Sequence, residues 1–132
     1  MIGLDTNVLL RVLVDDRSPQ VAAARRFVVE QANDGHQLYI DQIVLIELVW
    51  VLESVFGYAK EHVIAAIESL LNNTAYLIDG HAIVEAACAT FRVKSADLSD
   101  CLIAANHAAA GCAFTATFDK AMRGLPTTQV LR

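Results

Sequence analysis

Four carboxylates interrupt otherwise apolar stretches of the sequence: Asp5, Glu47, Asp100 and Asp119. Glu47 is the clearest case, because it stands in the middle of the apolar run 43–52. A helix that is apolar on all sides is normally buried, and a buried carboxylate needs a proton, a charged partner or a metal ion. These acids are therefore candidates for chemistry.

A fifth carboxylate, Asp97, lies three residues before Asp100 at the start of a predicted Ala-rich helix. Residues three apart share a helix face, so the two side chains can reach one point, and the helix dipole favours anions there. A set of oxygen ligands without His or Cys favours Mg²⁺ or Mn²⁺ over zinc. The four histidines show no ligand spacing and are expected to be surface residues or satisfied core residues.

Each acid also has a simpler interpretation. Asp5 can cap the helix that follows it, and Asp97 or Ser99 can cap the Ala-rich helix. Asp119 can be a turn residue, and Glu47 can pair with a buried arginine. Because three of the four stand at predicted strand ends or helix starts, where parallel sheets build their sites, the joint pattern favours a functional site.

The elements that position these acids follow from apolar spacing and from cap and breaker residues. Strands are predicted at 2–4, 37–40, 76–78, 112–115 and 128–131, and helices over 8–14, 19–33, 42–56, 60–71, 81–91 and 98–110. Short apolar strands between helices are typical of a parallel sheet covered on both faces, so the predicted fold class is α/β. The length of 132 residues fits a single domain over residues 1–132.

Composition narrows the classes of function. A net charge of −5 argues against a protein that binds nucleic acid through a broad basic surface, but not against a nuclease whose acids hold metal ions. Charged residues are only 19% of the chain and the mean hydropathy is +0.43, so we expect an apolar partner or dimer interface. The stretch around Trp50 and Phe56 is interpreted as a buried or interface stripe rather than a platform for nucleobases.

The remaining bulk features concern the compartment. Three cysteines without C-x-x-C spacing, Cys88, Cys101 and Cys112, predict buried free thiols in a reducing compartment. The N-terminal stretch has no basic region and is interrupted by Asp5, which is unlike a signal peptide. The apolar run 43–52 is too short to cross a bilayer, so a cytoplasmic protein without a membrane segment is predicted.

Four segments in order along the chain carry a family resemblance: Leu4-Asp5-Thr6-Asn7, Glu47-Leu48, Ala96-Asp97-Leu98-Ser99-Asp100-Cys101-Leu102-Ile103-Ala104 and Thr117-Phe118-Asp119-Lys120. In order and spacing they resemble the PIN-domain family, and within it the VapC-type toxins, over essentially the whole chain. The resemblance places an acidic quartet at Asp5, Glu47, Asp100 and Asp119, a further acid at Asp97, and supporting polar residues at Asn7 and Thr117. Cys101 departs from the short residue that the family often has there, which should leave the chemistry intact.

This resemblance implies a three-layer α/β/α sandwich around a short, mostly parallel central sheet. It also implies dependence on Mg²⁺ or Mn²⁺, homodimers, and a cognate antitoxin protein that covers the acidic groove in a larger complex. The implied activity is that of an endoribonuclease toxin, which hydrolyses RNA phosphodiester bonds with a metal-activated water. Asp5 and Asp100 would be the principal ligands, with Glu47, Asp97 and Asp119 completing the site or binding a second ion.

Substrate contacts are expected from basic residues, for which the candidates are Arg11, Arg92, Lys94, Lys120 and Arg123. Three other functions remain open. An aspartate-dependent phosphohydrolase would use Asp5 as nucleophile, but Asn7 stands where a second aspartate is usual. A receiver-like domain would need a phosphoacceptor Asp near mid-chain, where Glu47 stands. A non-catalytic PIN-like binding module would retain the fold without the activity.

Overall fold

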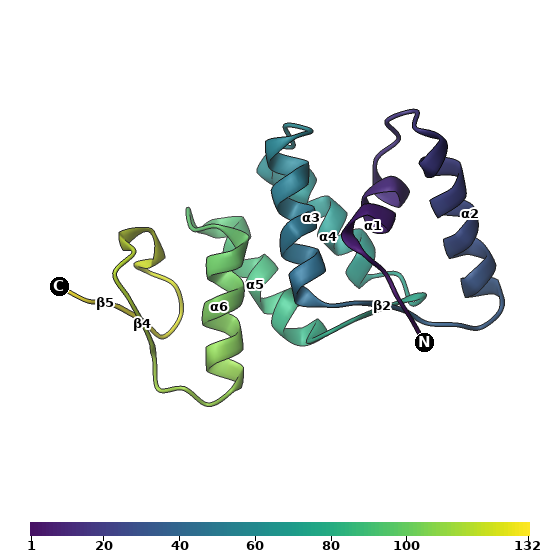
Figure 1. The fold of residues 1–132 in the computed structure, drawn as a ribbon. Coiled ribbons are helices and arrows are strands. Elements are labelled where there is room, and N and C mark those ends of the chain that lie inside the picture. The colour runs from purple at the N-terminus through teal and green to yellow at the C-terminus, as the bar shows by residue number, and fades with distance from the viewer. The chain divides into compact units, whose positions relative to one another are not determined.

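The computed structural model describes residues 1–132 and divides them into two units, Met1–Asp79 and Gly80–Arg132. The first unit contains the elements β1 (Ile2–Gly3), α1 (Thr6–Leu13), α2 (Pro19–Asn33), β2 (Leu38–Ile40), α3 (Gln42–Ser54), α4 (Lys60–Leu71) and β3 (Tyr76–Ile78). The second contains α5 (His81–Val93), α6 (Leu98–Ala109), β4 (Thr115–Thr117), the 3-10 helix η1 (Lys120–Met122) and β5 (Thr128–Val130) (Figure 1).

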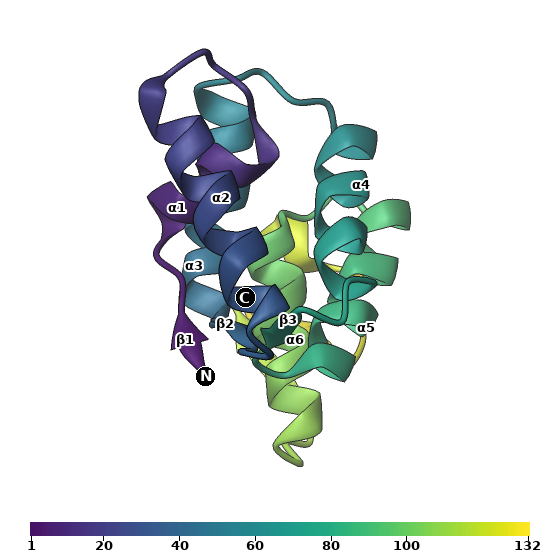
Figure 2. The same cartoon turned by 90° about the vertical axis from the view of Figure 1, so that its right-hand side faces the viewer.

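A three-stranded parallel sheet organises the first unit, with β2 between β1 and β3 (Figure 2). Parallel neighbours require crossover connections, and here a pair of helices links each strand to the next, α1 and α2 before β2 and α3 and α4 before β3. Leu38 and Ile40 of the central strand are fully buried. The strand ends are therefore fixed by the core, and the residues that follow β1 and β2 begin α1 and α3.

Local signals set the helix starts in this unit. Ser18 accepts a hydrogen bond from the backbone N–H of Gln20, with Pro19 at the first helical position of α2. Asp41 caps α3 by accepting from the N–H of Val44 at 2.8 Å. These caps confirm the predicted starts of both helices.

Helix α3 has two different faces. Leu45, Leu48 and Leu52 are fully buried, whereas Trp50 is 64% exposed. The remaining exposed apolar residues of this face and of the helix end are Ile43, Ile46 and Val55. The expectation that α3 is buried all round is therefore wrong, because one apolar face is enough to fill the core and the other is left to solvent or to a partner.

The second unit is a pair of packed helices and a two-stranded sheet. Helices α5 and α6 contact each other through one apolar stripe each, and β4 pairs with β5 in parallel, Thr115 opposite Thr128. The α/β class and the parallel pairing of short strands are thus confirmed in both units. No helix of the chain has the length and apolar content needed to span a bilayer.

Two expectations in this unit are wrong. The strand predicted over 112–115 is shifted to Thr115–Thr117, because the register is set by buried Thr115, which hydrogen-bonds His107 at 2.9 Å, while Phe114 stays 50% exposed. Cys112 is exposed rather than buried, since it lies in the turn that precedes β4. The other two cysteines are buried and form no disulfide, as predicted.

Candidate active site

Asp5 lies where β1 passes into α1. Its backbone is extended, at φ −80° and ψ 159°, and its Oδ1 accepts a hydrogen bond from the N–H of Thr6 at 2.8 Å. The side chain of Asp5 thus has the position of a helix cap, as the simpler interpretation proposed. Its second carboxylate oxygen takes no part in the hydrogen bond to Thr6. Capping and ligand binding are compatible for this carboxylate.

Thr6 holds the second carboxylate of this unit. Its hydroxyl donates to Oε2 of Glu47 at 2.7 Å, across 41 residues of sequence, and Thr6 itself is only 7% exposed. Glu47 belongs to the exposed side of α3, so its expected burial is wrong and it needs no buried arginine. The hydrogen bond fixes one oxygen of Glu47 and leaves the other to accept from a ligand.

The sequence interpretation did not single out Thr6. A usable signal was present, because Thr6 shares one helix face with Leu9 and Leu10, three and four residues further on, and that face is buried. A polar residue on a buried face needs a partner. Glu47 supplies that partner, so the two residues form one unit of the site.

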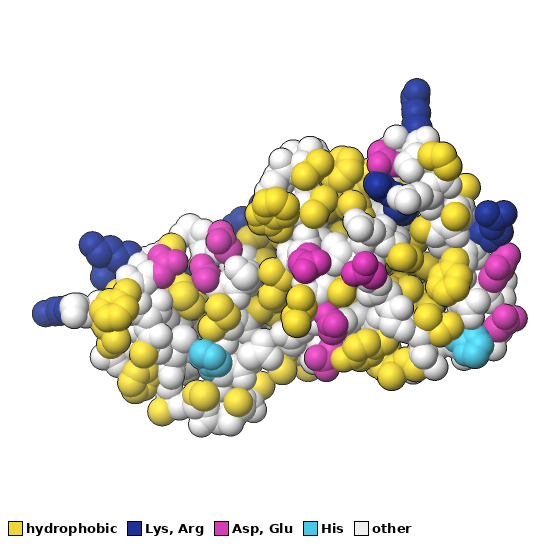
Figure 3. All heavy atoms as spheres, viewed as in Figure 1, with side chains coloured by type: hydrophobic (Ala, Val, Ile, Leu, Met, Phe, Trp, Pro, Cys, Tyr) yellow, Lys and Arg dark blue, Asp and Glu magenta, His cyan; other side chains and the backbone are white.

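The packing of α1 against α3 gathers these groups around one groove of about 500 Å³. Asp5, Asn7 and Glu47 line its polar part, and Ile46 and Trp50 line its apolar part. Hydrophobic side chains gather over α3 with acidic side chains beside them (Figure 3). The first unit therefore brings together three of the predicted site residues, Asp5, Asn7 and Glu47.

The second unit holds the other predicted acids. Asp97 occupies the N-cap position of α6, as the simpler interpretation proposed, but its side chain makes no capping hydrogen bond. Asp119 caps η1 through the N–H of Ala121 at 2.9 Å, and Thr117 Oγ1 accepts from the N–H of Asp119 at 3.0 Å. The predicted supporting residue Thr117 thus shapes the turn that carries Asp119.

Asp100 is the most perturbed acid of this group. Partial burial raises the pKa of its carboxyl above the ordinary value of 3.8, and the negative charges of Asp97 and Asp119 raise it further. A hydrogen bond from the backbone of Asp97 acts in the opposite direction and is the smallest effect. The three carboxylates of this unit therefore repel one another, and a bound cation would relieve that repulsion.

The donor set fits a hard divalent cation by its chemistry, since carboxylate, hydroxyl and amide oxygens are the ligands that Mg²⁺ and Mn²⁺ prefer. Within either unit, however, no three Asp, Glu, His or Cys side chains gather closely enough to hold a metal ion.

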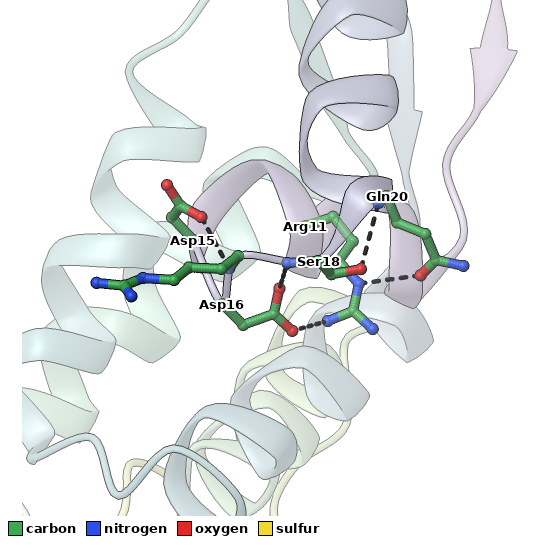
Figure 4. A network of polar contacts seen from close by, with 6 residues as sticks. Arg11, Asp15, Asp16, Ser18 and Gln20 are labelled. Atoms are coloured by element: carbon green, nitrogen blue, oxygen red, sulfur yellow. Dashed lines mark hydrogen bonds and ion pairs between the residues drawn. The ribbon is translucent and has the colours of Figure 1, made fainter.

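One predicted substrate contact has a structural role instead. Arg11 pairs with Asp16 at 2.6 Å and donates to Gln20 at 3.1 Å (Figure 4). Asp15 and Asp16 also accept from the backbone of residues 17 and 18, which closes the turn between α1 and α2. Arg11 is therefore used to hold this turn.

Replacing Asp100 by Asn should stabilise the protein in metal-free buffer. Because its folded pKa is raised, the folded state binds the proton more tightly than the unfolded state, and stability falls as pH rises above 3.8. We expect Asp100→Asn to have a higher Tm than the parent at pH 7, with the gain shrinking as pH falls toward 3.8. Thermal unfolding at several pH values measures this, with Glu30→Gln as control for net charge. An Asp100→Asn Tm at or below that of the parent over this range would contradict it.

Comparison with known proteins bears on the family resemblance of the sequence. Residues 2–126 match the family described as PIN domain. The chain is also similar to a VapC ribonuclease of Aquifex aeolicus (strain VF5), with 27% identity over 99 residues, which cover 75% of this chain and 73% of that protein. The resemblance found in the sequence is thus confirmed. Because the family match spans nearly all of both units, the chain belongs to the PIN-domain family.

Proposed function

We propose that this protein is a metal-dependent endoribonuclease that hydrolyses RNA phosphodiester bonds, and that it is the toxin of a type II toxin–antitoxin pair. One observation carries the proposal: the chain belongs to the PIN-domain family, is similar to a VapC ribonuclease, and has five carboxylates at its element junctions, in the first turn of α6 and on α3. Mutual repulsion around Asp100 supports a cation at these acids.

In this proposal five acids are ligands of the metal ions. Asp5 and Asp100 are the principal ligands of Mg²⁺ or Mn²⁺, and Glu47, Asp97 and Asp119 complete the site or hold a second ion. When bound, the metal activates a water for attack and offsets the negative charge that develops on the phosphate.

The surrounding residues orient the ligands. Thr6 anchors Oε2 of Glu47, so that carboxylate presents its other oxygen without having to lose rotamer freedom when a ligand binds. The N–H of Thr6 does the same for Oδ1 of Asp5. Asn7 lines the same groove and can donate from its amide to a phosphate or sugar oxygen.

The proposed partners are a second copy of the chain and a cognate antitoxin protein, which together form a larger complex. The exposed apolar face of α3 supports an interface, because Ile43 and Trp50 are 69% and 64% exposed. Large aromatic residues are enriched in interfaces, and isolated surfaces rarely expose several of this size together. A reducing compartment such as the cytoplasm fits the free thiols.

Cleavage of labelled total RNA tests the activity directly. Purified protein freed of any partner should cut RNA with Mg²⁺ or Mn²⁺ and stop cutting in a chelator. Asp5→Asn and Asp100→Asn should each lose at least about 100-fold in rate, because a carboxylate that offsets transition-state charge is removed. Glu30→Gln, an exposed acid on α2, is the control and should cut like the parent. Equal cutting by the parent and both Asn variants would sink the proposal.

Replacing Thr6 by Val tests the anchoring of Glu47. The variant keeps the shape of the side chain and removes the donor, so we expect cleavage to fall about 10- to 100-fold, as for other residues that orient metal ligands. Thr6→Ser keeps the hydroxyl and should restore most of the rate. If Thr6→Val cleaves as fast as Thr6→Ser at equal folded fraction, the hydrogen bond has no part in the activity.

Mass measurement tests the proposed interface. At micromolar concentration we expect the parent to be a dimer and Trp50→Glu to be a monomer, because a buried unpaired charge at the centre of an interface is strongly unfavourable. Val29 on α2 is comparably exposed at 57%, so Val29→Glu is the matched control and should remain a dimer. A monomeric parent, both alone and with the antitoxin, would refute an interface on α3.

A further inference from the structure

A groove of about 720 Å³ in the second unit is lined by three cationic side chains, Lys120, Arg123 and Arg132. The rest of its lining comes from β5 and the residue after it, and no Asp or Glu belongs to it. Lys and Arg side chains project from this end of the chain, near β5 (Figure 3). A groove with one sign of charge is unusual in a chain whose net charge is −5, so composition alone does not account for it.

These cations are not used to hold the structure. All three are exposed. Unlike Arg11, none of the three has a side-chain hydrogen bond or an ion pair. Unpaired cations at one groove repel one another, and an anion bound among them offsets this repulsion.

The backbone around the groove is also suited to an extended ligand. β5 pairs with β4 on one side only, because the sheet of this unit has two strands, and Gln129 on β5 is exposed. Lys120 and Arg123 come from η1 and its C-cap, which directly follow Asp119. The cations thus begin one residue after a proposed catalytic acid, and Arg132 follows the end of the edge strand by two residues.

We propose that this groove binds the phosphodiester backbone of single-stranded RNA and leads the RNA strand toward Asp119 and the other proposed ligands of this unit. This rests on the proposed function. Arginine offers paired donors that match a phosphate and lysine offers a point charge, and such contacts position a nucleic acid without selecting its sequence. An acidic nuclease must bring a polyanion close to a cluster of carboxylates that repels it. The cations of the groove supply the attraction that offsets this repulsion.

Salt dependence of binding measures the number of phosphates that the groove neutralises. For single-stranded nucleic acid, each phosphate contact contributes about 0.7 to the slope of log affinity against log salt concentration. The double variant Lys120→Gln/Arg123→Gln should therefore lower the magnitude of the slope by about 1.4. We would measure it by fluorescence anisotropy with a labelled oligouridylate, in a chelator, so that binding is read without cleavage.

Two control variants make the result specific. Arg17→Gln/Arg26→Gln removes the same charge from exposed positions of the first unit and should keep the parent slope. Lys120→Arg/Arg123→Lys keeps both charges in the groove and should also keep it. An equal loss of slope in the Arg17/Arg26 variant would overturn the proposal, because it would show an effect of net charge alone.

Cleavage assays separate this proposal from the proposed function. Lys120→Gln/Arg123→Gln should raise KM with little change in kcat, whereas Asp100→Asn should lose kcat and keep the salt slope. An unchanged slope and KM in the double variant, with Asp100→Asn inactive, would overturn the groove and leave the nuclease standing. The proposal would also be overturned if the double variant kept the parent salt slope but no longer bound the antitoxin. The groove would then be assigned to the binding of an acidic protein segment.

Discussion

The hydrogen bond from Thr6 Oγ1 to Glu47 Oε2 joins the first turn of α1 to the middle of α3, and the candidate site of the first unit depends on it. β1 must end before Asp5 because the sheet is short, and α1 must then start with one face toward the core. That geometry buries Thr6 and aims its hydroxyl at Glu47 in the middle of α3. A polar atom on a buried face and a carboxylate on an apolar helix thereby satisfy each other.

The second unit handles its carboxylates differently. Asp97, Asp100 and Asp119 have no such neutral side-chain donor between them, and partial burial together with their mutual repulsion raises the pKa of Asp100. This arrangement costs folding free energy whenever Asp100 is ionised. Proteins retain strain of this kind mainly where function requires it, so the electrostatics of this unit agree with a role in binding a cation.

Sequence reasoning located most helix boundaries, because caps such as Ser18 and Asp41 act within a few residues of their partners. It failed where a tertiary contact decided the outcome. The strand at β4 was misplaced because an apolar run at Phe114 is exposed, while its register depends on pairing with β5. For the same reason the acids could be chosen from the sequence, but the partner of Glu47 could not.

Bulk charge was the least informative property for function. A net charge of −5 averages over acids that are spread along the chain and cations that gather locally, so it conceals the groove of Lys120, Arg123 and Arg132. Low overall basicity also serves a metal-dependent enzyme, because a strongly basic surface would compete with the cation for its carboxylates. Attraction of a polyanion is then best confined to one groove beside the acids, where it raises the local concentration of substrate without neutralising the metal ligands.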